Sequence, residues 1–505
     1  MSTGAIRKAP LEMGPDDFRQ AGHALVDRIA EFLVWINDRW NPVTNAESPK
    51  KIRQLLRGGG LPESGSEGRE LLENVTNVLF NHSLFNGHPR FWGYVTSSPA
   101  PIGMLADLLA SAVNPNVGAF DLSPVATEIE RQTVRWIAEM IGYPTTCGGL
   151  LVSGGNQANF VGFLAARKAK VPWDVRKEGL ALAGRMPLRI YCSSETHTWI
   201  NKAADLFGLG TEAIVWIPAG NDQRMDAAFL RRKIAEDKEQ GLTPLLVAGA
   251  AGTVGTGKVD PLEEIAAICK DAGVWFHVDG AYGGFAAVLP EASADLKALR
   301  LADSVAVDPH KWLYAPLEAG CALVRDRTIL LETFSYHPEY YHFDGHEDEE
   351  LTNFYEYGPQ NSRGFRALKV WLALQQAGRE GYIDMIREDC AVAEELFRAL
   401  PDYPELEPLT CSLSITTFRY VPQDLQTGGK DVDEYLNKLN AEVLSRLQRS
   451  GNVYPSNAVV NGKYALRICI VNFRTTREDI LSLPQLAVAA GKEVDAEMRT
   501  RELSH

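Results

Sequence analysis

The chain has 505 residues, of which 45% are hydrophobic and 23% are charged, an ordinary balance for a globular enzyme. Its 51 basic and 65 acidic residues leave a net charge of −14, which argues against nucleic acid or an anionic membrane as the main partner. The length exceeds what one hydrophobic core usually supports, so we expect two compact units and a shorter attached segment.

Cysteine usage and the first residues bear on the compartment of the protein. The seven cysteines stand singly, without a CxxC pair, which is typical of reduced, buried thiols. The opening MSTGAIRKAPLEMGPDD lacks the apolar core of a signal peptide, and no uncharged apolar run reaches membrane-spanning length. We therefore expect a cytoplasmic protein.

A helical pattern begins the chain at residues 15–40, where apolar residues such as Phe18, Leu25 and Ile29 recur at helical spacing. The apolar stripe is wide for a terminal arm with no sequential partner, so we expect it to pack on another subunit. A connector rich in glycine, glutamate and serine follows at residues 57–68, and a second helical pattern covers residues 70–81.

From about residue 145 the chain alternates between short apolar runs and helical stretches. The runs predict strands at residues 149–153, 188–193, 213–218, 244–250, 274–279, 304–308 and 321–326. This alternation is typical of an α/β fold, here a mostly parallel seven-stranded sheet with helices on both faces. The chain from about residue 391 is typical of a small α+β unit. We expect a helical dimerisation arm, a large domain carrying the site and a small C-terminal domain, at residues 1–100, 101–390 and 391–505.

Polar residues occur where several of these strands end, which is the edge of an open sheet at which ligands bind. SGGNQAN, beginning at Ser153, ends the first strand and opens a helix. Small residues there expose backbone N–H groups to a phosphate, although a tight turn capped by Ser153 or Asn156 would leave the same pattern. His197 follows the second strand, Asp279 ends the fifth and Lys311 follows the sixth.

Asp279 and Lys311 each have a structural and a functional interpretation. Asp279 is a helix cap, an ion-pair partner or the carboxylate that keeps a ligand's ring nitrogen protonated. Lys311 stands in DPHKWLYAP, where the apolar WLY cluster would desolvate it, lower its pKa and make it a Schiff-base nucleophile; the common alternative is a lysine with its tip in water. A phosphate turn, a ring-facing histidine, a strand-end aspartate and a strand-end lysine together form the set that a pyridoxal phosphate site requires.

Two other patterns suggest different chemistry. GAAGTVGTG, at residues 249–257, is glycine-rich like a dinucleotide-binding turn, but KVDPLEE separates it from the next helix and no GxGxxG is present. Three histidines stand near acidic residues in the segment that contains His337, His342, Asp344, His346 and Glu347. Metal binding needs fixed ligand geometry, so we interpret this segment as a charged, solvated loop and expect no metal.

The same residues resemble the group II pyridoxal-phosphate decarboxylases, the family of aromatic-amino-acid, glutamate, histidine and cysteine-sulfinate decarboxylases. HVDGAYGG and DPHKWLYAP are similar to the family's aspartate and lysine segments, and SSETHTW is similar to its histidine segment. GHPRFWGY, SPVATEIE and ALRICIVNFRTT extend the resemblance from about residue 15 to the C-terminal region. It implies pyridoxal 5'-phosphate as cofactor, the aspartate-aminotransferase type of fold (fold type I) and a homodimer with sites at the subunit interface.

By position, the resemblance implies catalytic roles for Lys311, Asp279, His197 and Tyr355. Lys311 would form the Schiff base with the cofactor, Asp279 would hold the pyridine nitrogen and His197 would stack on the ring. Further cofactor contacts are implied for Gly155, Asn156, Ala281, Asp308, His310, Ser97 or Ser98, and Thr256.

The implied reaction is decarboxylation of an L-amino acid to the amine and carbon dioxide. In the family a tyrosine on a loop donates a proton to the product carbon. That position falls on Phe354 here or, with a slip of one residue, on Tyr355. By the same resemblance, a phenylalanine there would let oxidative aldehyde formation compete with amine formation.

The substrate side chain is less clearly indicated. Positions with large apolar residues in animal aromatic decarboxylases are Asn86, Asn116 and Gly118 here, so the implied pocket is roomier and more polar, although the aromatic residues of FWGY, residues 91–94, remain. Aromatic amino acids are the favoured substrates. Acidic amino acids, an aldehyde synthase and a catalytically silent dimeric scaffold are the alternatives.

Overall fold

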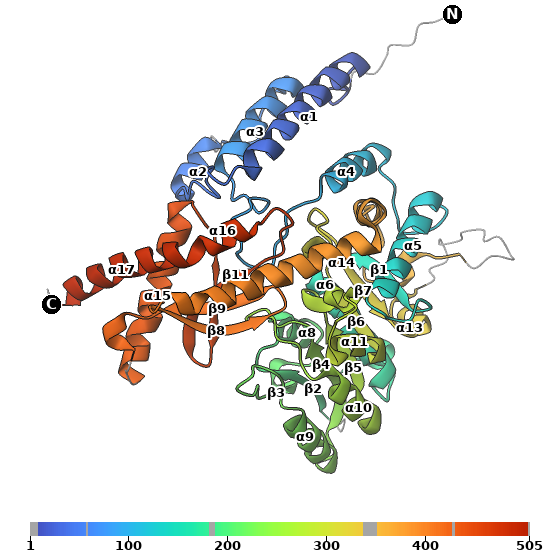
Figure 1. The fold of residues 1–505 in the computed structure, drawn as a ribbon. Helices are drawn as coiled ribbons and strands as arrows, with labels where there is room; N and C mark the ends of the chain where they lie inside the picture. The colour runs from blue at the N-terminus through green and yellow to red at the C-terminus, as the bar shows by residue number, and fades with distance from the viewer. Residues whose placement is uncertain (1–8, 57–58, 181–186, 337–350, 427–429, 503–505) are drawn as a thin grey trace, which may run out of the picture.

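The computed structural model describes residues 9–56, 59–180, 187–336, 351–426 and 430–502. The chain begins with an arm of three helices, α1 (Pro15–Asn37), α2 (Pro49–Leu55) and α3 (Gly68–His82), which project together from the body of the molecule (Figure 1). Phe32 of α1 stacks on Phe80 of α3 with ring centroids 4.3 Å apart. The two helices predicted at residues 15–40 and 70–81 are confirmed.

A seven-stranded sheet forms the centre of the large unit, with strand order β1-β7-β6-β5-β4-β2-β3. β7 points opposite to the other six strands and is therefore antiparallel to both of its neighbours, β1 and β6. The predicted mostly parallel sheet is therefore confirmed, and each predicted strand lies within a few residues of an observed one. The bounds are β1 (Gly148–Val152), β2 (Leu188–Ser193), β3 (Ile214–Ile217), β4 (Thr243–Ala250), β5 (Trp275–Asp279), β6 (Ser304–Val307) and β7 (Gly320–Val324).

Both faces of this sheet are buried. Successive residues of a strand point to opposite faces, and here they belong to two separate apolar clusters. Leu151 and Phe276 belong to one cluster, while the adjacent Leu150 and Trp275 belong to the other. The helices of the large unit, including several short ones, are α4 (Pro101–Val113), α5 (Pro124–Met140), α6 (Gly155–Lys170), α7 (Val175–Glu178), α8 (Trp199–Leu206), α9 (Ala227–Glu239), α10 (Leu262–Ala272), α11 (Ala294–Lys297), α12 (Pro309–Trp312) and α13 (Arg327–Phe334).

The C-terminal part forms a smaller unit around a four-stranded antiparallel sheet of order β10-β11-β9-β8. A long helix, α14, crosses from the large sheet to this small sheet (Figure 1). Its only non-helical residue is Gly378, with φ of 65°. The elements are α14 (Ala367–Ala399), β8 (Leu406–Ser412), β9 (Ile415–Tyr420), α15 (Lys430–Ser450), β10 (Ser456–Val460), β11 (Lys463–Cys469), α16 (Arg477–Leu481) and α17 (Leu483–Glu502).

The predicted boundary at residue 390 falls within continuous structure, while that at residue 100 falls just before α4. Residue 390 lies inside α14, and the core of the small unit begins at Val392 of the same helix. Trp92, from the predicted N-terminal arm, is fully buried in that small core. Its backbone N–H donates to the Tyr454 carbonyl, and its own carbonyl accepts from the Cys469 N–H, both at 3.0 Å. The division into three domains stays a prediction.

Two features predicted from composition can be compared with the structure. All seven cysteines are free, and Cys192, Cys269, Cys321 and Cys469 are buried. Within the described ranges, no helix is both long and apolar enough to cross a membrane.

Candidate active site

The predicted polar residues meet at one edge of the large sheet. β1 runs antiparallel to β7, and β7 runs antiparallel to β6, so β1 points the same way as the parallel strands and ends at the same edge. A cavity of about 1220 Å³ opens there, which is larger than the roughly 300–1000 Å³ of most small-molecule sites. Its lining includes eight predicted site residues, namely Gly155, Asn156, His197, Asp279, Ala281, Asp308, His310 and Lys311.

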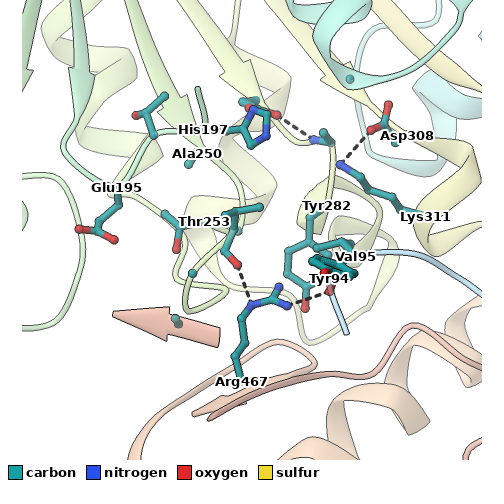
Figure 2. A pocket seen from close by; sticks show the side chains of 18 of the residues that line it. Tyr94, Val95, Glu195, His197, Ala250, Thr253, Tyr282, Asp308, Lys311 and Arg467 are labelled. Carbon is teal, nitrogen blue, oxygen red and sulfur yellow. Dashed lines mark hydrogen bonds and ion pairs between the residues drawn. The ribbon is translucent and has the colours of Figure 1, made fainter. Parts of the chain in front are cut away.

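Lys311 reaches the cavity from α12, a single turn that follows β6. Asp308 stands at the start of this turn, and its Oδ2 lies 2.9 Å from the Lys311 Nζ (Figure 2). The Asp308 side chain is 1% exposed, and its other oxygen, Oδ1, has no hydrogen-bond partner among the described residues. A buried carboxylate oxygen without a partner is costly, so this atom is available to a donor from a bound group.

His310 links this turn to two other segments. Its ring Nδ1 accepts a hydrogen bond from the Ala319 backbone N–H, and its backbone N–H donates to the Ala319 carbonyl, both at 3.1 Å. The Ser97 hydroxyl donates to the His310 carbonyl at 2.8 Å. Desolvation lowers the pKa of His310, although Asp308 raises it. Ser97 is therefore placed as a support for the turn rather than in the cavity lining.

Asp279 and His197 face the cavity from neighbouring strand ends. Asp279 is partly buried at the end of β5, and its Oδ1 accepts from the Ala281 N–H at 3.1 Å. Desolvation in the recess lowers the pKa of His197, while Asp279 raises it and Lys311 lowers it. The imidazole, the carboxylate and the amine thus interact electrostatically within one site.

The start of α6 forms the narrow end of the cavity. None of the described side chains caps this helix, so the first backbone N–H groups, near Asn156, keep the partial positive charge of a helix N-terminus. Gly154, with φ of 151° and ψ of −177°, has a conformation reserved for glycine. A Cβ on Gly155 would lie 2.8 Å from Asp308 Oδ2. This end therefore suits an anion held by backbone groups, as the phosphate interpretation requires.

Arg467, which was not among the predicted site residues, reaches the cavity from β11 of the small unit. Its Nε donates to the Val254 carbonyl and its Nη1 to the Tyr94 carbonyl, both at 2.8 Å (Figure 2). Nη2 has no partner among the described residues. An arginine inside the otherwise apolar ALRICIV run was the available signal, but nothing in the sequence placed this strand beside the large sheet.

Some predicted residues lie elsewhere. Thr256 is fully buried and does not line the cavity; its hydroxyl is 3.1 Å from that of Thr253, which does line it. Tyr355 is 8% exposed, and its N–H donates to the Gly118 carbonyl at 2.9 Å, so these two predicted residues lie together but not in the Lys311 cavity of the same chain. Phe354 is 1% exposed and is covered by the Arg363 guanidinium at 4.8 Å from its ring centroid.

The predicted aromatic lining of the pocket is wrong in two of its three residues. Phe91 and Trp92 are buried in the protein core, where Phe91 stacks on Tyr454 at 5.5 Å. Only Tyr94 of the three lines the cavity. Asn86 lines a neighbouring groove, and the histidines predicted to form a solvated loop, including His337, lie outside the described residues.

Comparison with known proteins identifies the family. Residues 49–416 match the pyridoxal-dependent decarboxylase conserved domain. The chain belongs to the pyridoxal-dependent decarboxylase family. This decarboxylase is 32% identical over 485 residues to an aromatic-L-amino-acid decarboxylase of Bacillus atrophaeus, covering 96% of this chain and 97% of that protein. It is 30% identical over 476 residues to a phenylacetaldehyde synthase of Petunia hybrida, with 92% of each chain covered.

The fold agrees with this membership. The crystal structure of Oryza sativa TDC with PLP and tryptamine matches this decarboxylase with a TM-score of 0.88 and 27% identity, covering 96% of this chain and 99% of that one. The enzyme is therefore a carboxy-lyase with the fold of pyridoxal-phosphate decarboxylases, and pyridoxal phosphate is its cofactor.

The cavity fits this cofactor in three respects. The uncapped start of α6 can receive the phosphate, and the glycines there leave space that a Cβ would fill. The partnerless Asp308 Oδ1 can accept a hydrogen bond. A lysine and a second carboxylate, Asp279, stand within the same lining. The donor set of the cavity is thus the one that the cofactor's aldehyde, ring nitrogen and phosphate need.

Proposed function

We propose that this decarboxylase converts an L-amino acid with an aromatic side chain to the amine and carbon dioxide. The observation that carries the proposal is the convergence of Lys311, Asp279 and His197 on one cavity beside an uncapped helix start. The names of the relatives support an aromatic side chain. The presence of Tyr94 and Val95 in the lining is compatible with such a side chain.

Each residue has a proposed task. Lys311 would attach the cofactor through Nζ, Asp279 would keep a proton on the ring nitrogen, and His197 would cover one ring face opposite Ala281. Backbone N–H groups of Gly155 and Asn156 would hold the phosphate. When bound, pyridoxal phosphate supplies an electron sink for the pair of electrons left by departing carbon dioxide.

The other cavity residues would control charge and position. Asp308 would orient the Lys311 Nζ, from which it is 2.9 Å away. Arg467 would place positive charge at the cavity wall, where it attracts the carboxylate of an incoming amino acid. Tyr355 would return the proton to the product carbon.

The proposal includes a homodimer, to which two observations point. Large apolar side chains are exposed on the arm and on α4, among them Phe18 at 62%, Trp40 at 83% and Leu108 at 57%. Tyr355 lies with Gly118, away from the Lys311 cavity of its own chain. A second copy that covers the apolar faces could supply these residues to the site.

Aldehyde synthesis is the second candidate, favoured by the 30% identity to a phenylacetaldehyde synthase. Acidic amino acids remain candidate substrates because the lining includes Arg467. A catalytically silent scaffold is the non-enzymatic alternative to the proposal that this chain turns over a substrate.

A product assay separates these functions. The enzyme, reconstituted with pyridoxal phosphate, is given aromatic, acidic and basic L-amino acids in turn, and amine, carbon dioxide, ammonia and hydrogen peroxide are measured. We expect equal amounts of amine and carbon dioxide from an aromatic substrate. Lys311→Ala should lose both this activity and the visible absorption band of the bound cofactor, whereas Lys168→Ala, a change on the surface of α6, should keep them. Carbon dioxide with ammonia and peroxide would indicate the aldehyde synthase, and a Lys311→Ala variant that matches wild type would refute the proposal.

A further inference from the structure

Asp389 of α14 is a buried carboxylate below the turn that carries Lys311. Its side chain is nearly enclosed, with the residue 4% exposed. One oxygen, Oδ2, accepts two hydrogen bonds, from the Trp312 Nε1 at 2.8 Å and from the Tyr314 hydroxyl at 2.7 Å. These donors belong to the first and third residues after Lys311. One carboxylate oxygen therefore binds two side chains of the segment that directly follows the lysine.

The turn has further contacts that make its position sensitive to this carboxylate. Tyr314 has φ of 54°, in the left-handed region that is unfavourable for a bulky residue. Its carbonyl accepts from the Ala100 N–H at 2.8 Å, and the Tyr382 hydroxyl donates to the Leu313 carbonyl at 3.1 Å. Tyr382 and Asp389 are two helical turns apart, on one face of α14. This helix therefore bonds to the turn at two points, one of them through Asp389.

The ring of Trp312 connects the same carboxylate to the cavity wall. Trp312 stacks on Tyr282 with centroids 5.0 Å apart and planes at 12°. Tyr282 lines the cavity, and its hydroxyl is 2.7 Å from that of Ser414 in the small unit. The orientation of the Trp312 indole thus fixes both the exit of the lysine turn and the packing of a lining residue.

We propose that Asp389 is a positioning residue: it fixes the backbone position and side-chain direction that Lys311 needs to bond the cofactor. The inference rests on the proposed role of Lys311 as the attachment point. Without Asp389, the Trp312 N–H and the Tyr314 hydroxyl would remain buried without an acceptor, and the turn would shift to find one. A shift at these two residues moves the backbone of Lys311 directly.

Asparagine is the conservative replacement at this position. Burial raises the pKa of Asp389 to about 7, while the bonds from Tyr314 and Trp312 lower it. The carboxyl can therefore exist in its neutral form near neutral pH. The backbone N–H of Asn472 also interacts with this carboxyl group. An amide oxygen can accept both bonds from the turn in the same place, so Asp389→Asn keeps the contacts to Trp312 and Tyr314 and loses only the acceptor for Asn472. Asp389→Leu keeps much of the volume and removes every acceptor.

The experiment compares Asp389→Leu, Asp389→Asn and wild type, with Asp384→Leu as control because the Asp384 side chain is 78% exposed on the same helix. Apoprotein is titrated with pyridoxal phosphate, the visible band is titrated with acid and base, and kcat and KM are measured on the reconstituted enzyme. We expect Asp389→Leu to raise the half-saturating cofactor concentration at least tenfold, to shift the pH midpoint of the band and to lower kcat more than it raises KM. Asp389→Asn and Asp384→Leu should stay within about threefold of wild type.

The stability of each apoprotein, measured by urea denaturation, separates positioning from mere support of the fold. An Asp389→Leu variant that is less stable but keeps wild-type cofactor affinity and band titration would overturn the inference. If that variant does not fold, Tyr314→Phe removes one of the two bonds with little change of volume, and an unaltered band would then overturn it. If the visible band of the bound cofactor persists in Lys311→Ala, the proposed function itself is refuted.

Discussion

Gly155→Ala tests whether the narrow end of the cavity holds the cofactor. The added Cβ would lie 2.8 Å from Asp308 Oδ2 and 3.0 Å from the Ala281 Cβ. Neither neighbour moves freely, since Asp308 is 1% exposed and paired with Lys311 and since the Ala281 N–H bonds to Asp279. Overpacking of this kind costs about 1–3 kcal/mol.

The expected effects on folding and on cofactor binding differ. Alanine is favoured over glycine in the middle of a helix by about 0.5–1 kcal/mol, and at the first position of α6 the gain is at most that, so the free energy of unfolding should fall by roughly 0–3 kcal/mol. Cofactor binding gains nothing from the helix, and a displaced Asp308 would weaken it. At 1.4 kcal/mol per factor of ten, we expect the Kd for pyridoxal phosphate to rise about 5- to 100-fold.

The assay is a fluorescence titration of apoprotein with pyridoxal phosphate, together with urea denaturation. Gly381→Ala, in α14, is the control, because its added Cβ meets only the Ala377 Cβ at 3.4 Å. This control should keep wild-type affinity and gain roughly 0.5–1 kcal/mol of stability. A Gly155→Ala variant with cofactor affinity within twofold of wild type would show that this end of the cavity does not bind the phosphate.

Three further predictions concern the product, the buried sheet and the oligomer. With dissolved oxygen as the oxidant, Tyr355→Phe should move part of the product from amine to aldehyde, read as ammonia and peroxide; an unchanged product ratio would show that the assignment of the proton donor is wrong. Burial lowers the pKa of His277 to about 3, so its neutral form stabilises the fold above pH 6.5 and this contribution is lost as the pH falls toward 3. Between pH 7 and pH 5 the free energy of unfolding of the wild-type apoprotein should therefore fall by about 2 kcal/mol more than that of His277→Asn. If the two free energies of unfolding differ by the same amount at both pH values, the His277 ring is not buried in its neutral form. In the proposed homodimer, Leu108→Glu should shift the particle from dimer to monomer in light scattering and remove most activity, whereas an unchanged mass would exclude α4 from the interface.

The large sheet was predictable because its physical signal is local. Buried parallel strands are short apolar runs, and the end of each run marks the edge where polar residues gather. This is why Asp279, His197 and Lys311 could be placed together before any coordinates were known. The turn chemistry of SGGNQAN added the helix start on the same reasoning.

The remainder depends on contacts between segments that are distant in the chain. Arg467 lines the cavity from β11, whereas Phe91 is buried outside it, stacked on Tyr454. Neither contact has a local signature in the sequence. Thr256 is buried with its hydroxyl 3.1 Å from that of Thr253, a contact within one turn that the spacing of the two threonines did not reveal, and its role toward the cofactor stays a prediction. In the proposed homodimer, the roles of Phe354 and Tyr355 would depend on a second copy, and the periodicity of a single chain does not encode such contacts.

The insertion of residues 91–94 into the small C-terminal unit has a consequence for biosynthesis. Arg467 donates a hydrogen bond to the Tyr94 carbonyl across 373 residues of sequence, and Trp92 is part of the small core. A ribosome therefore releases the large sheet long before the last strands emerge to enclose this early segment. Closing so long a loop slows folding, and until it closes Trp92 is exposed to solvent, which makes the partly folded chain prone to aggregation.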